Sequence, residues 1–301
     1  MLVFKASSAA IDGLCFTPDG RLLATGSGHG VTVWDVTGVP KAVRSFPAGG
    51  TFCSVAVSPC GRFMATGGRC LGVFDLATGR EEPLVASFGV ISFAFAPDGT
   101  EFATPGYSPH QWAVPSWEVI RAGPPWESSP DGRQQYCTGV LAYTPDSRSL
   151  GVSFAVQTEP GRRYDWCVML FDCATGARTG ALDMPFGHAA PTQIAFRPDG
   201  AVVAGNYGPV VGVVSVASGD VVARIKAGTK HITGIAFTPD GSKLIAVSND
   251  ARVRVYDAHA WTEVEGYEWK VGKLRSVAVA PDGLRMAAGS GTGKVVIWDV
   301  G

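Results

Sequence analysis

Seven aromatic and basic residues gather in two stretches of the sequence and are the residues best suited to bind another molecule. They are Trp126, Arg133, Tyr136, Arg162, Arg163, Tyr164 and Trp166. Tryptophan, tyrosine and arginine are enriched at interaction hot spots, because rigid rings supply apolar area and a guanidinium grips a carboxylate or phosphate with two hydrogen bonds. The pattern predicts a surface for a protein or peptide partner that is acidic or phosphorylated. In the alternative interpretation these loops only pack on each other, with Trp166 entering the core and the arginines paired with nearby acidic residues.

The rest of the sequence contains little that resembles a catalytic or metal site. Glu-x-x-His and His-x-His spacings are missing, and no Ser, Cys or Asp nucleophile stands in a recognisable base-paired context. Eight further polar residues near turns could line a channel mouth or be ordinary turn residues: His29, Tyr107, His110, Asn206, Tyr207, His231, Asn249 and Asp250. We therefore expect no enzyme activity, no metal and no cofactor.

The elements that position these residues come from a repeat of about forty residues. The turn prolines of the repeat are Pro18, Pro59, Pro97, Pro145, Pro198, Pro239 and Pro281, with gaps of 41, 38, 48, 53, 41 and 42 residues. Apolar runs flank each Pro-x-x turn, which predicts β-hairpins and an antiparallel sheet of up to four strands per repeat. Runs such as 55–57 and 295–297 are apolar at consecutive positions, so both faces of these sheets must be buried.

Five repeats also carry an aromatic-Asp pair, and with the turns these pairs make the sequence similar to a known family. The pairs are Trp34-Asp35, Phe74-Asp75, Phe171-Asp172, Tyr256-Asp257 and Trp298-Asp299. The chain resembles the WD-repeat β-propellers over essentially its whole length. The resemblance implies an all-β fold, one seven-bladed β-propeller domain of four-stranded antiparallel blades over residues 1–301, and a non-catalytic interaction scaffold. A small-ligand or sugar binder, and a propeller hydrolase that uses the central channel, remain as alternatives.

Several repeats depart from the family pattern. Family blades commonly carry a hydrogen-bond network of His, Ser or Thr, Asp and Trp, but Ala246 and Ala288 stand where Ser or Thr would. Most blades are therefore expected to be held by packing. The third repeat has Gln111-Trp112-Ala113 in place of the aromatic-Asp pair. The last repeat ends after its third strand, so residues 2–5 are predicted to pair with residues 295–299 and complete the last blade.

The two longest gaps, 48 and 53 residues, both touch the fourth repeat. Residues 123–136 join an outer strand to the next inner strand, and residues 157–166 join the two middle strands of one blade. In an up-and-down blade these two connections emerge on the same rim. The seven aromatic and basic residues are therefore predicted to lie together on the rim around the fourth blade.

Composition limits the class of partner and the compartment. The formal net charge is −1, which gives no global attraction to nucleic acid or to an anionic membrane. No stretch of about 18 apolar residues occurs, and the first residues lack the features of a secretory signal. Seven cysteines without a Cys-x-x-Cys motif indicate reduced core residues. We expect a monomeric, cytoplasmic propeller.

Overall fold

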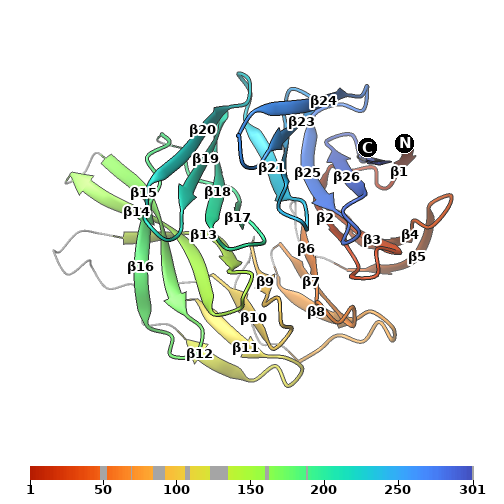
Figure 1. The fold of residues 1–301 in the computed structure, drawn as a ribbon. Coiled ribbons are helices and arrows are strands. Elements are labelled where there is room, and N and C mark those ends of the chain that lie inside the picture. Colours follow the sequence, from red (N-terminus) through yellow and green to blue (C-terminus); the bar gives the residue numbers. More distant parts are fainter. Residues whose placement is uncertain are drawn as a thin grey trace. The chain divides into compact units, whose positions relative to one another are not determined.

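The regular elements of this protein are β-strands arranged in antiparallel sheets. The computed structural model describes residues 1–47, 53–68, 70–83, 92–105, 109–122, 135–159, 163–187 and 189–299. These residues form six four-stranded sheets and one sheet with three described strands (Figure 1). We number the sheets as blades 1 to 7 in chain order, and blade 2 is the three-stranded one. The prediction of an all-β, seven-bladed fold is confirmed. In the described part of the chain, no helix is long and apolar enough to cross a membrane.

The chain divides into two compact units, Met1–Ile91 with Thr233–Gly301, and Ser92–Ile232. The prediction of a single domain is not tested by this division and stays a prediction. In the first unit, blade 1 contains β2 (Ile11–Phe16), β3 (Leu22–Ser27), β4 (Gly30–Asp35) and β5 (Lys41–Phe46). Blade 2 contains β6 (Ser54–Val57), β7 (Phe63–Gly67) and β8 (Gly72–Asp75). Blade 6 contains β21 (Ile232–Phe237), β22 (Lys243–Ser248), β23 (Arg252–Asp257) and β24 (Glu263–Glu268). Blade 7 contains β25 (Leu274–Val279), β26 (Arg285–Ser290), β27 (Lys294–Asp299) and β1 (Leu2–Lys5).

The second unit contains the three middle blades. Blade 3 consists of β9 (Ala94–Phe95), β10 (Glu101–Thr104), β11 (His110–Ala113) and β12 (Val119–Ala122). Blade 4 consists of β13 (Gln135–Tyr143), β14 (Ser149–Glu159), β15 (Arg163–Asp172) and β16 (Arg178–Asp183). Blade 5 consists of β17 (Ile194–Phe196), β18 (Val202–Tyr207), β19 (Val210–Ser215) and β20 (Val221–Lys226).

The Pro-x-x turns have a local physical cause. In blade 1 the Thr17 hydroxyl donates to Asp19 Oδ1 at 2.5 Å, and the Arg21 N–H donates to the same oxygen at 3.0 Å. Gly20 has a φ of 67°, which glycine adopts without a steric penalty. Blade 6 repeats the arrangement around Asp240. The turn residues recognised in the sequence therefore close these hairpins by themselves.

The first strand of the chain completes the last blade, as predicted. β1 pairs antiparallel with β27, from Leu2 opposite Ile297 to Lys5 opposite Lys294. Leu2 and Phe4 pack against the apolar cluster between blades 7 and 1. The ring centroids of Phe4 and Trp34 lie 4.9 Å apart. The strand therefore contributes both main-chain pairing and buried apolar area.

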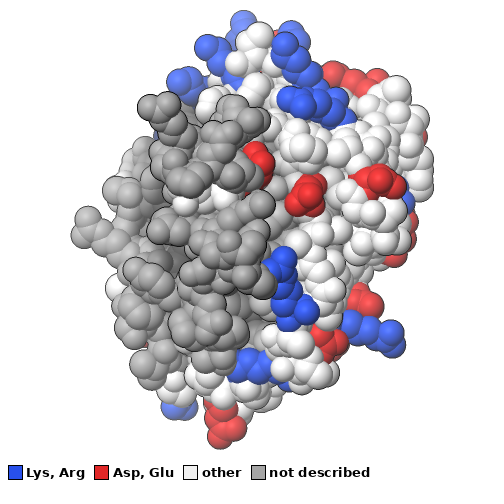
Figure 2. Space-filling model, turned by 90° about the vertical axis from the view of Figure 1, so that its left-hand side faces the viewer, with Lys and Arg blue, Asp and Glu red and all other residues white. Residues whose placement is uncertain are grey.

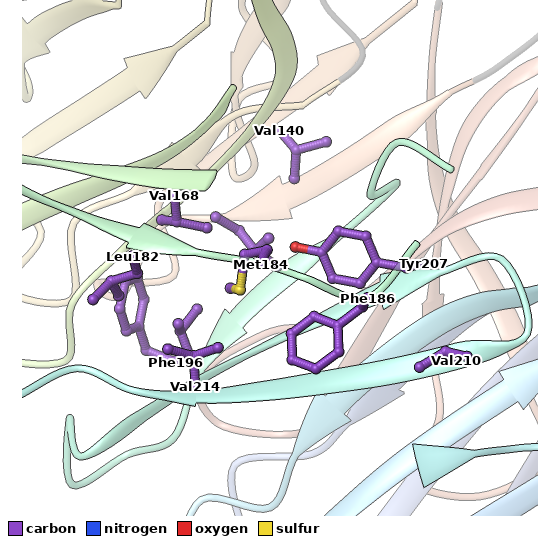
Figure 3. Close-up of a cluster of buried hydrophobic side chains, with 11 residues drawn as sticks. Val140, Val168, Leu182, Met184, Phe186, Phe196, Tyr207, Val210 and Val214 are labelled. Carbon is purple, nitrogen blue, oxygen red and sulfur yellow. The ribbon is translucent and has the colours of Figure 1, made fainter. Parts of the chain in front are cut away.

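A dense apolar cluster fills the space between blades 4 and 5 (Figure 3). Phe186 and Tyr207, with ring centroids 5.5 Å apart, lie side by side in it. A Cβ atom added at Gly212 would lie 2.1 Å from the Phe186 ring. Glycine is required there because the ring occupies the place of a side chain.

Most blades are expected to be held by packing, but blade 3 also contains a polar network. The Glu101 carboxylate accepts hydrogen bonds from Gln111 Nε2 at 2.9 Å, Arg121 NH1 at 3.1 Å and the Tyr143 hydroxyl at 3.4 Å. Burial is the main cause that raises the pKa of Tyr143 far above its usual value. Gln111, which precedes Trp112 at the aromatic position of the repeat, is thus part of a partly buried polar network that joins blade 3 to blade 4.

Candidate functional site

Blade 4 has the longest strands among the described residues. β13, β14 and β15 contain 9, 11 and 10 residues, whereas β16 contains 6. The β14 and β15 ladder runs from Ser149 opposite Asp172 to Glu159 opposite Arg163. Most of the second insertion, which the sequence places in a connection between strands, therefore continues the two strands. In Figure 1 these strands extend as long arrows.

The strand register brings four of the seven predicted residues onto neighbouring positions. Tyr136 in β13 pairs with Ala155, and Ala155 also pairs with Trp166 in β15. Tyr164 pairs with Gln157, and Arg163 pairs with Glu159. Trp126, Arg133 and Arg162 lie outside the described residues. The partner-binding role of all seven residues stays a prediction.

Trp166 has a definite place in the packing. Its side chain is half-buried and packs against the apolar cluster between blades 4 and 5. The indole Nε1 is buried and has no hydrogen-bond partner among the described residues. This agrees with the alternative interpretation for Trp166, which has this residue entering the core.

Charge on the described surface near this blade is mixed. Figure 2 shows the side of the molecule that lies at the left of Figure 1, and both basic and acidic residues are interspersed with uncharged surface over its described part. Two exposed residues of opposite sign in this unit are Lys226 in β20 and Asp165 in β15. The described surface on this side therefore shows no large field of a single sign.

Two of the weaker candidates are structural. Asn206 is 1% exposed. Its Oδ1 accepts from the N–H groups of Thr192 and Gln193 at 3.1 and 2.8 Å, and its Nδ2 donates to the Ile232 carbonyl at 3.0 Å. Tyr207 is 2% exposed, inside the cluster of Figure 3. Neither residue is accessible enough to line a channel mouth.

The other weaker candidates are dispersed. Asp250 forms an ion pair with Arg254 at 2.7 Å, and His110 stacks on Trp112 with ring centroids 5.7 Å apart. His29 and His231 are exposed, and Tyr107 lies outside the described residues. Over the described ranges, no three His, Cys, Asp or Glu residues are grouped so that they could hold a metal ion.

The cysteines are free thiols, but not all of them are core residues as the sequence predicted. Cys53, Cys167 and Cys173 are buried, and burial is the main cause that raises the pKa of Cys167 to about 12. Cys60 and Cys70 are exposed. Cys60 lies in the Pro-x-x turn of blade 2, at the position that aspartate occupies in the other turns. That turn position is on the surface in every blade, which explains its exposure.

Antiparallel blades built from one repeat define a β-propeller. A family model described as "WD domain, G-beta repeat" matches residues 1–35, 219–257 and 264–299. Together with the seven blades, these matches identify the chain as a WD-repeat β-propeller protein, as the aromatic-Asp pairs predicted.

Similar proteins carry the same repeat. WD repeat-containing protein SL1-17 of Schistosoma mansoni is 30% identical over 135 residues, which is 44% of this chain and 44% of that protein. Serine-threonine kinase receptor-associated protein of Homo sapiens is 26% identical over 134 residues, 44% of this chain and 37% of that protein. Intraflagellar transport protein 122 homolog of Xenopus tropicalis is 39% identical over 69 residues, 23% of this chain and 6% of that protein. The chain thus spans less than half the length of each of these relatives.

Proposed function

We propose that this protein is a non-catalytic scaffold that binds a protein or peptide partner at the rim around blade 4. The observation that carries the proposal is the elongation of β13, β14 and β15. Their register has Tyr136 and Trp166 on either side of Ala155, and Tyr164 and Arg163 follow at the end of β15. Membership of the WD-repeat propellers supports a protein partner. So does the name of one relative, which describes association with a serine-threonine kinase receptor.

The residue types of the rim indicate the chemistry of the partner. Arg133, Arg162 and Arg163 suit an acidic or phosphorylated segment, because a guanidinium binds a carboxylate or phosphate with two parallel hydrogen bonds. The aromatic residues would add apolar contact area. Because the net charge is −1, we propose that the partner is neither a nucleic acid nor a membrane. We also propose that the protein is a cytoplasmic monomer.

Affinity capture from a native lysate tests this function. The wild type is compared with the variant Arg162→Ala/Arg163→Ala/Tyr164→Ala and with a control, Arg80→Ala/Lys230→Ala, that removes exposed charges elsewhere. We expect the triple variant to lose partners that the control retains. If every captured partner survives the triple change, the rim of blade 4 is not the binding site.

A further inference from the structure

Three connections meet at one rim of blade 7. They are the residues that follow β1, the residues that precede β25, and the turn between β26 and β27. The Gly291 N–H donates to the Lys273 carbonyl at 2.7 Å, and the Gly293 carbonyl accepts from the Ala6 N–H at 2.9 Å. The turn is thus hydrogen-bonded to both of the other connections, which fixes the three of them relative to each other.

These connections and the strand ends beside them carry four exposed lysines, which are Lys5, Lys270, Lys273 and Lys294. None of the four forms an ion pair with another residue in the described part of the chain. Residues 1–11, 269–281 and 286–298 together contain five basic residues and no acidic residue. This rim therefore has a local positive charge, although the net charge of the whole chain is −1.

Two of these lysines lie directly opposite each other. Lys5 in β1 pairs with Lys294 in β27. Like charges at directly opposite positions of an antiparallel pair repel each other and destabilise the pair. The Lys5 ammonium also donates to the Thr292 carbonyl, which holds it beside the turn. An anionic group bound at the two lysines would offset their repulsion, so the arrangement favours a negatively charged ligand.

Apolar side chains lie on the same face of blade 7 as this lysine pair. Val296 and Trp298 belong to the cluster between blades 6 and 7, and Lys294 shares their face because the side chains of a strand alternate. Val3 is opposite Val296 and is 44% exposed. The half-buried Trp269 packs on Trp298, with ring centroids 4.8 Å apart. Partly exposed apolar surface therefore accompanies the lysines.

We propose that this surface binds an acidic segment of a partner protein, with an apolar residue of the segment placed on the exposed apolar side chains. We call the surface the blade 7 patch, and it consists of Val3, Lys5, Trp269, Lys270, Lys273 and Lys294. Ammonium groups attract carboxylates, and the hydrogen-bonded connections pre-organise the patch, which lowers the entropic cost of binding. No residue of the patch belongs to the proposed site at blade 4, so this proposal does not depend on that function.

Acidic residues beside the patch favour a short protein segment over a nucleic acid. Glu268 directly precedes Trp269 and pairs with Arg252 at 3.2 Å, and Asp12 pairs with Arg275 at 3.1 Å. These carboxylates would repel the phosphates of a nucleic acid that continued past the lysines. A protein segment with only a few carboxylates avoids this repulsion.

Subtractive peptide selection on the full chain tests the proposal. A phage-displayed library of random dodecapeptides is first depleted on the variant Lys270→Glu/Lys273→Glu/Lys294→Glu, which removes peptides that bind elsewhere, and is then panned against the wild type. Fluorescence anisotropy gives the affinity of each enriched peptide for the wild type, for Lys270→Gln/Lys294→Gln and for the control Lys41→Gln/Arg80→Gln. The control removes the same number of exposed positive charges outside the patch.

We expect the enriched peptides to be acidic and to contain an apolar residue. They should bind the control as tightly as the wild type, and should bind Lys270→Gln/Lys294→Gln roughly five- to tenfold more weakly, as the loss of two exposed ion pairs predicts. Their affinity should fall as the salt concentration rises. The melting temperature of the single variant Lys294→Gln should not lie below that of the wild type, because one like-charge pair is removed.

Several outcomes would overturn the proposal. They are a depleted library without enriched peptides, and an equal loss of affinity in the two double variants, which indicates a general charge effect. A lower melting temperature of Lys294→Gln would show that the fold, and not a ligand, requires this lysine. If a fluorescein-labelled oligothymidylate binds the wild type as tightly as the peptides do and binds Lys270→Gln/Lys294→Gln more weakly, the patch is a nucleic-acid site and the protein partner is wrong.

Discussion

Trp34 and Trp298 occupy matching positions in blades 1 and 7 but differ in one hydrogen bond. Trp34 Nε1 donates to the Thr25 hydroxyl at 3.0 Å, and that hydroxyl donates to the Thr32 carbonyl at 3.2 Å. Trp298 is 3% exposed, and its Nε1 is buried without a partner among the described residues. We predict that Ala288→Thr supplies the missing acceptor.

The strand registers identify Ala288 as the counterpart of Thr25. Trp34 pairs with Leu23, and Thr25 lies two residues further along β3, opposite Thr32. Trp298 pairs with Met286, and Ala288 lies two residues further along β26, opposite Val296. A threonine at 288 can therefore accept from Trp298 and donate to the Val296 carbonyl, as Thr25 does in blade 1.

The size of the effect follows from the cost of an unpaired buried donor. Leaving such a group unsatisfied costs roughly 1–3 kcal/mol, and a typical hydrogen bond contributes about 1 kcal/mol net. Ala288 is fully buried, so any larger side chain also strains its surroundings. Comparison with Ala288→Val cancels that strain, because valine has the shape of threonine without the hydroxyl. We expect the free energy of unfolding of Ala288→Thr to exceed that of Ala288→Val by about 1 kcal/mol.

Equilibrium urea unfolding of the two variants measures this difference, and Trp298→Phe provides the control. Without the indole N–H, the advantage of threonine over valine should disappear. A protein with threonine in an apolar site, where the hydroxyl has no hydrogen-bond partner, is less stable than the same protein with valine there. The reasoning is therefore refuted if Ala288→Val is as stable as Ala288→Thr, or if the advantage of threonine persists in Trp298→Phe.

Four further predictions concern a strained turn, a thiol, a carboxylate and the first strand. Trp261 has a φ of 58°, so in urea unfolding Trp261→Gly should be about 1 kcal/mol more stable than Trp261→Ala, the reverse of the usual order. Burial alone would raise the pKa of the Cys60 thiol, but hydrogen bonds from the Ser58 hydroxyl and the Arg62 N–H lower this pKa overall. Iodoacetamide should therefore modify Cys60 before the buried Cys167, which peptide mass spectrometry measures. The hydrogen bond from the Thr238 hydroxyl is the main cause that lowers the pKa of Asp240 to about 2. The ionised carboxylate therefore stabilises the fold fully above pH of about 4, and this stabilisation is lost as the pH falls toward 2. The melting temperature of Asp240→Asn should fall less steeply over that range than the melting temperature of the wild type. Deletion of Met1 to Lys5 should lower the melting temperature, because it removes β1 from β27 and the buried area of Phe4.

Each of these four predictions has an outcome that contradicts it. Trp261→Ala would have to be the more stable variant, or Cys60 and Cys167 would have to react equally fast. Parallel pH profiles of the wild type and Asp240→Asn would show that Asp240 is not linked to acid stability. A truncated chain with an unchanged melting temperature would show that β1 does not hold blade 7.

The fold could be predicted from the sequence because each hairpin is specified locally and the same specification recurs. The hydroxyl of Thr17, the carboxylate of Asp19 and the positive φ of Gly20 close one turn with contacts inside a few residues. Such short-range chemistry can be recognised in the sequence without knowledge of the rest of the structure. The pairing of β1 could be predicted for a different reason. Residues 2–5 belong to no repeat, and the last repeat supplies only three strands, so each provides what the other lacks.

The extension of blade 4 could not be predicted, because its cause is not local. The segment that contains Pro160, Gly161 and several charged residues has the composition of a loop. Its flanks are strands because they pair with each other, with Gln157 opposite Tyr164 and Glu159 opposite Arg163, so residues without a strong β preference are held in a ladder. The residue types of the candidate site are evident in the sequence, but the paired strands that contain four of them are not.

Blade 3 shows the same limit from the opposite direction. The sequence around Gln111 lacks the aromatic-Asp pair of the repeat, and nothing in the sequence distinguishes Glu101 from an ordinary surface charge. In the structure, Gln111 and Arg121 from blade 3 and Tyr143 from blade 4 all donate to the Glu101 carboxylate. Each of these residues is unremarkable in the sequence alone. The partly buried carboxylate is stabilised only because several donors converge on it. The loss of the repeat pattern in blade 3 is thus offset by polar contacts that only the packing of two blades brings together.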